Sequence, residues 1–119
     1  MKLWHLCRSR WNHLVSLLLA FLHRTHDSIR HHGEKPEAKQ KLQNTILEIT
    51  KDTRKTYRGA APAIGELERE IRSEWDREEC KTQKDVLHFT LYRINHPRGA
   101  SVPPNIARII YQRVDAIAC

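Results

Sequence analysis

The chain has 119 residues, a length that fits one domain and excludes folds that need about 250 residues, such as a (β/α)₈ barrel. Hydrophobic residues make up 39% and charged residues 29%, and the apolar residues recur in ordered stripes, which argues against disorder. Four Gly and five Pro are too few for a loop-rich sandwich or barrel. The formal charge of +7 favours acidic partners, such as nucleic acid, an anionic membrane or an acidic protein surface.

The three cysteines, Cys7, Cys80 and Cys119, are odd in number and have no short spacing. They form neither a disulfide framework nor a C-x-x-C metal or redox pair. This usage favours a reducing, intracellular setting, cytoplasmic or nuclear, over secretion.

Residues 1–33 are predicted to form an apolar helix, with hydrophobic side chains over more than half of its circumference. We interpret it as the central helix of a core, with a helix lying in a membrane interface as the alternative. The apolar run from Leu14 to Leu22 is shorter than the roughly 20 residues that span a bilayer. The run resembles the apolar part of a secretory signal, but no small-residue cleavage site follows it.

Residues 36–58 are predicted to form a basic amphipathic helix, with Pro36 in its first turn and Gly59 just past its end. One face carries an apolar stripe that includes Leu42, Ile46 and Ile49. The other face is basic, and the residues from Lys51 to Arg58 lie within about 10 Å of helix axis. Its cations are Lys41, Lys51, Arg54, Lys55 and Arg58.

Residues 63–80 are predicted to form an acidic helix with seven acidic and three basic side chains. Its apolar seam is narrow, as in a surface helix that shows one stripe to the core. Because a short connector joins it to the basic helix, the two should pack antiparallel. The sequence leaves open whether the acidic helix neutralises the basic face.

Residues 83–95 are predicted to be helical, since Thr82 and Asp85 resemble a capping box. Residues 86–94 also alternate well enough for a strand, which is the alternative. Residues 105–118 are predicted to form a C-terminal helix that Asn105 caps. Arg113 lies inside its apolar arc, where it either snorkels or pairs with an acid of another helix. The fold class is therefore all-α, one domain over residues 1–119 that forms a small bundle of four to five helices.

No motif for catalysis is present: there is no G-x-S-x-G, no P-loop and no G-x-G-x-x-G, so no catalytic residue is assigned and the protein is predicted not to be an enzyme. His23 and His26 stand three residues apart, a spacing compatible with a metal but unspecific without a second ligand pair. We therefore predict no metal and no cofactor.

The leading functional hypothesis is sequence-independent binding of nucleic acid, RNA or a duplex backbone, through the basic helix face. Its candidate residues are Lys41, Lys51, Arg54, Lys55 and Arg58. The alternative is a regulatory adaptor that docks a protein partner or self-associates, or a protein that makes peripheral membrane contact. Its candidate contacts are Trp4, Trp11, Leu18 and Trp75.

Overall fold

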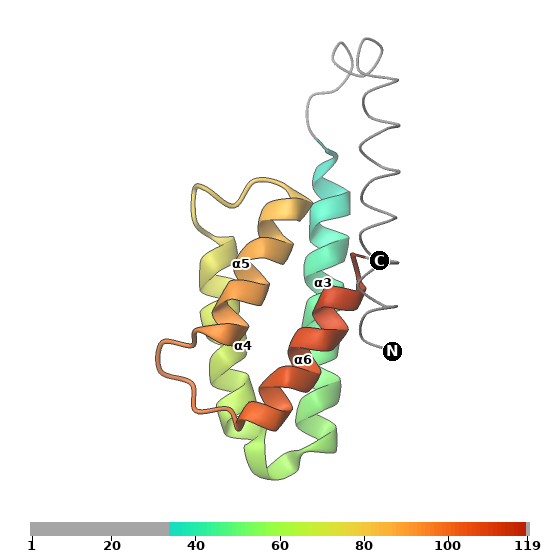
Figure 1. Ribbon diagram of the computed structural model, residues 1–119. Coiled ribbons are helices and arrows are strands. Elements are labelled where there is room, and N and C mark those ends of the chain that lie inside the picture. Colours follow the sequence, from blue (N-terminus) through green and yellow to red (C-terminus); the bar gives the residue numbers. More distant parts are fainter. Residues whose placement is uncertain (1–33, 119) are drawn as a thin grey trace, which may run out of the picture. The chain divides into compact units, whose positions relative to one another are not determined.

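The computed structural model describes residues 34–118, which contain four α-helices, one short 3₁₀ turn and no strand. The helices are α3 (Pro36–Thr56), α4 (Ala61–Trp75), α5 (Gln83–Asn95) and α6 (Pro104–Ala116), and the 3₁₀ turn is η1 (Arg58–Ala60). Successive helices run in opposite directions (Figure 1), and residues Glu34–Ile117 form one compact unit. The predicted all-α bundle is confirmed for this part of the chain. The predicted helix 1–33 lies outside the described residues.

Helix α3 begins at Pro36, whose ring fixes the backbone in a helical conformation where no N–H partner is needed. Its apolar stripe is buried as the sequence predicts, and Ile46 is completely inaccessible. The helix ends at Thr56, two residues before the predicted end, and the tight turn η1 reverses the chain into α4. This turn places the last turn of α3 beside the first turn of α4.

Helix α4 ends at Trp75, five residues before the predicted end at Cys80. The irregular connection of residues 76–82 allows Cys80 to turn inward, where it is 3% exposed. No Gly or Pro follows Trp75 to indicate the end of the helix. The charged residues after Trp75 continue the pattern of the helix, and the predicted helix is therefore too long. At its start, α4 includes Ala61 and Pro62, which the sequence assigns to the connector.

Helix α5 has the predicted range, and the strand alternative for residues 86–94 is wrong. Thr82 accepts a hydrogen bond from the Asp85 N–H at 3.1 Å, and Asp85 accepts one from the Thr82 N–H at 3.0 Å. This reciprocal capping box supplies acceptors for N–H groups that have no partner inside the helix. Val86, Thr90 and Arg93 are all buried at helical spacing, so the helix buries one face.

Helix α6 completes the bundle by packing against α3 and α5. The predicted cap at Asn105 is wrong, because Asn105 lies inside the first turn and the N-cap is Pro103, whose side chain makes no capping hydrogen bond. The helix ends at Ala116, two residues before the predicted end. Ile110 and Val114 of α6 are inaccessible to solvent and meet the buried faces of the other helices. Arg113 donates to Asp52 of α3 at 3.3 Å, and both side chains are about half exposed. The pairing expected as one option for Arg113 is therefore the one that the structure adopts.

Candidate nucleic-acid interface

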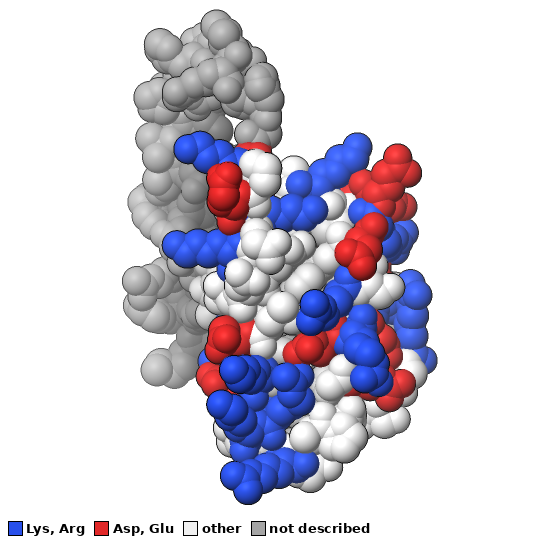
Figure 2. Space-filling model, turned by 180° about the vertical axis from the view of Figure 1, so that it is seen from behind, with Lys and Arg blue, Asp and Glu red and all other residues white. Residues whose placement is uncertain are grey.

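Lys51, Lys55 and Arg58 form an exposed cationic cluster where α3 passes into η1, and we call this cluster the basic end. Lys51 and Lys55 lie one helical turn apart on the side of α3 opposite its buried stripe. None of the three forms an ion pair with any residue in the range 34–118. In Figure 2 basic side chains gather at the lower end of the molecule, where α3 ends.

Arg54 differs from its neighbours because it is held in an internal contact. Its guanidinium donates to the Glu68 carboxylate of α4 at 2.6 Å, and Thr50 donates to the same oxygen at 2.6 Å. Burial raises the pKa of Glu68, but the hydrogen bonds from Thr50 and Arg54 outweigh it and hold the pKa below its ordinary value of 4.5. Arg54 therefore joins α3 to α4, although the sequence groups it with the candidate contact residues.

Lys41 is exposed but stands apart from the basic end. Ten residues separate it from Lys51, which is about 15 Å of helix axis. The exposed carboxylate of Glu48 lies between them on the same helix. The sequence groups five cations together. In the structure three of them, Lys51, Lys55 and Arg58, form the basic end and have no ion-pair partner among the described residues.

The acidic side chains of α4 mostly face away from α3. Glu70 accepts three backbone hydrogen bonds from the loop between α5 and α6, from the N–H groups of Arg98 at 2.6 Å, Gly99 at 2.9 Å and Ala100 at 2.8 Å. Burial raises the pKa of Glu70, but these donors outweigh it and lower the pKa. The Glu70 carboxylate is therefore engaged by the loop between α5 and α6.

Glu74 has a second cluster of partners on the same side of α4. Arg93 donates to one of its oxygens at 2.7 Å, Arg98 donates to that oxygen at 3.1 Å, and Arg77 donates to the other oxygen at 3.0 Å. Glu74 is 2% exposed and Arg93 is 8% exposed. Glu70 and Glu74 therefore have their partners on the side of α4 that faces away from α3. Among the described residues, Glu68 is the carboxylate of α4 that forms an ion pair with α3.

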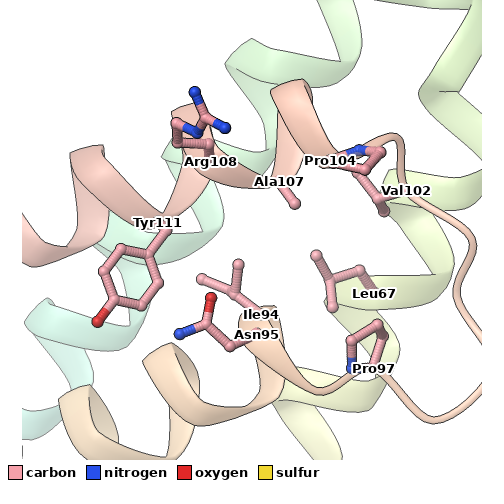
Figure 3. A pocket seen from close by; sticks show the side chains of 9 residues that line it. All are labelled: Leu67, Ile94, Asn95, Pro97, Val102, Pro104, Ala107, Arg108 and Tyr111. Carbon is pink, nitrogen blue, oxygen red and sulfur yellow. The ribbon is translucent and has the colours of Figure 1, made fainter.

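The hollows on the described part of the surface include two shallow ones of similar volume and a smaller, more polar one beside Trp75. The first, of about 390 Å³, adjoins the basic end, and we call it the Tyr57 hollow. It is lined by Tyr57, Gly59, Ala60, Ala63, Ser101, Pro103 and Ile106. The second, of about 380 Å³, lies between α4, α5, α6 and the loop that precedes α6 (Figure 3). It is mostly apolar, with Asn95, Arg108 and Tyr111 among its lining residues. Neither hollow was signalled by a motif, because each is lined by residues far apart in the sequence.

Trp75 is the one predicted partner contact that falls in the described range, and it belongs to the core. Its side chain is 8% exposed, and its indole N–H donates to the Thr90 hydroxyl at 2.9 Å. The position does not fit a contact with a partner. The other candidate contacts lie outside the described residues, as do the two candidate metal-binding histidines. These residues are Trp4, Trp11, Leu18, His23 and His26.

Cys80 is a buried thiol rather than an exposed nucleophile. Burial raises its pKa, and the nearby Lys39 ammonium only partly offsets this effect. Within residues 34–118, no three side chains of His, Cys, Asp or Glu come together as a metal site would require. None of the four described helices combines the length and the apolar character that crossing a bilayer demands.

No family model, no curated protein and no solved structure matches this chain. The assignment of function therefore rests on the residues themselves.

Proposed function

We propose that this protein is a non-enzymatic nucleic-acid-binding protein that contacts phosphates through the basic end. The observation that supports the proposal is the separation of charge on the two sides of α4. Three exposed cations lie together on α3 and η1, while Glu70 and Glu74 are held by the loop 98–100 and by arginines on the other side. An anionic strand approaching the basic end therefore meets three exposed cations that have no ion-pair partner among residues 34–118.

The cations contribute affinity by releasing the counterions condensed on the nucleic acid. Each neutralised phosphate contributes a slope of about −0.7 to −0.9 when log Kobs is plotted against log salt. Three contacts at Lys51, Lys55 and Arg58 therefore weaken binding roughly 20- to 40-fold when salt rises from about 50 to about 200 mM. Lysine and arginine side chains that meet phosphates do not read base sequence, so the binding is independent of sequence.

The test measures binding of the full chain to fluorescently labelled RNA and DNA by anisotropy at these two salt concentrations. The variant Lys51→Glu/Lys55→Glu should bind at least tenfold more weakly and lose most of the salt dependence. The matched control is Lys81→Glu/Lys84→Glu. This control changes the net charge equally, at exposed positions in and just after the connection between α4 and α5.

The control should retain most of the affinity, because its positions lie at the opposite end of α4 from η1 (Figure 1). Equal losses in the two variants would mean that net charge and not the basic end determines binding. Absence of binding to either nucleic acid at about 50 mM salt would refute the proposal, since a cluster of unpaired cations binds polyanions at low ionic strength.

A further inference from the structure

The Tyr57 hollow adjoins the basic end through the chain itself. Arg58, a member of the basic end, lies between Tyr57 and Gly59, which both line the hollow. Lys55 precedes Tyr57 by two residues. Two of the three cations of the basic end, Lys55 and Arg58, are therefore next to this shallow hollow along the chain.

The lining of the hollow is uncharged and includes one aromatic ring, which suits contact with an uncharged ring. Tyr57 is half-buried and packs against the core, so its ring is held in place. The residues around it are mostly small, and a Cβ added at Gly59 would meet no atom within 4 Å. Its volume of about 390 Å³ lies in the range of about 300–1,000 Å³ that holds small ligands. No charged side chain lines it.

We propose that the Tyr57 hollow takes an unpaired base of a single-stranded nucleic acid, with the adjacent phosphates on Lys55 and Arg58. A nucleotide has an uncharged flat ring next to an anionic phosphate. The structure offers an uncharged hollow, which would match the ring, next to unpaired cations, which would match the phosphate. Bases stack on aromatic side chains in proteins that bind single strands without sequence preference. A duplex offers such a base only at the free-energy cost of unpairing and unstacking it. This inference rests on the proposed function and deepens it.

The test compares three labelled probes of about twelve nucleotides binding to the full chain. The first is a single strand, the second is a duplex of the same sequence, and the third is a single strand in which abasic sites replace the bases. The abasic strand keeps the phosphates and lacks only the bases, which are the part that the hollow would bind. We expect the ordinary single strand to bind at least fivefold more tightly than the abasic strand at about 200 mM salt.

Variants at the hollow assign this difference to Tyr57. Tyr57→Leu keeps an apolar side chain against the core but removes the ring, and it should weaken binding of the ordinary strand between about fivefold and about a hundredfold. Tyr57→Phe should bind as the unaltered chain does. Ser101→Leu narrows the hollow from an exposed position, so it tests the site with little risk to folding. None of the three should change binding of the abasic strand.

The outcomes separate this inference from the proposed function. If the ordinary and abasic strands bind equally and both respond to Lys51→Glu/Lys55→Glu, the basic end binds phosphates but the hollow takes no base. If Tyr57→Leu weakens both strands equally, the ring supports the fold and the inference is overturned. If free adenosine monophosphate binds as tightly as the strand, the occupant is a mononucleotide and the strand assignment is wrong. If no probe binds, the proposed function fails as well.

Discussion

Arg93 donates two hydrogen bonds to the same oxygen of Glu74, from Nε at 3.0 Å and from Nη2 at 2.7 Å. Its remaining nitrogen, Nη1, donates to the backbone oxygen of His96 at 2.7 Å. The guanidinium therefore joins α4 to the C-terminal end of α5. Each charge of this pair is satisfied by its partner, and both side chains are buried, at 2% exposure for Glu74 and 8% for Arg93. The arrangement makes the pair sensitive to the loss of either member, because the remaining charge would stay buried.

Glu74→Gln should therefore destabilise the bundle strongly. Removing one partner of a buried ion pair costs about 3–5 kcal/mol, a large part of the stability of a small domain. Urea denaturation followed by circular dichroism measures the change. Glu78→Gln is the matched control, since Glu78 is exposed and forms no ion pair with any residue of the range 34–118. Similar midpoints for the two variants would show that the Glu74 cluster contributes no net stability.

The carboxylates of α4 predict that the bundle loses stability in acid. The pKa of Glu74 is lowered: burial raises it, but the hydrogen bonds from Arg77 and Arg93 and the charges of Arg93 and Arg98 outweigh burial. The pKa values of Glu68 and Glu70 are lowered as well. Below the ordinary value of 4.5 the unfolded chain binds more protons than the folded chain, so stability rises with pH in this window.

The contribution of these groups is complete above about pH 5 and is lost as pH falls through the lowered folded pKa values. The urea midpoint should therefore decline between about pH 5 and about pH 2. Glu74→Gln should decline less steeply, since Gln does not titrate. A midpoint that is flat across this range would mean that the paired carboxylates contribute nothing to the pH dependence.

Glu68→Gln should raise the affinity for nucleic acid while it lowers stability. The glutamine has no charge to hold Arg54, so the guanidinium becomes free to join the basic end. We expect a gain in affinity of roughly two- to fivefold at about 100 mM salt. The loss of stability should be about 1 kcal/mol, because the pair is partly exposed. Glu78→Gln makes the same change in net charge far from the basic end, and an equal gain in that variant would contradict a local effect of Arg54.

The hydrogen bond between Trp75 and Thr90 can be tested by a double-mutant cycle. Thr90→Val leaves the buried indole N–H without an acceptor, which costs about 1–3 kcal/mol. Trp75→Phe removes the donor. In the Trp75→Phe background, Thr90→Val should therefore lower the free energy of unfolding much less than it does in the unaltered chain. Urea denaturation of the three variants gives the coupling. Additive losses would show that the hydrogen bond makes no net contribution to stability.

The helical fold could be predicted because local signals and the hydrophobic pattern agree. Pro36 starts α3, the capping box of Thr82 and Asp85 starts α5, and the buried residues follow the helical period. The period alone did not exclude a strand over residues 86–94, but the cap favoured the helix. The end of α4 could not be predicted, since no breaking residue precedes the turn that buries Cys80.

Within residues 34–118, the sequence by itself determined which segments are helical, the buried stripes and the separation of apolar from basic faces, because these depend on residues within a few turns of one another. Which charges stay free was decided only by the tertiary structure. Arg54 and Lys55 are neighbours in the sequence, yet Glu68 across the helix contact holds the first, and the second has no ion-pair partner among the described residues. The loop amides that hold Glu70, and the hollow that joins Tyr57 to Ser101, also arise between distant segments. Charge pairing and cavities depend on distances of a few ångströms between packed segments. The periodicity of one segment gives no information about these distances.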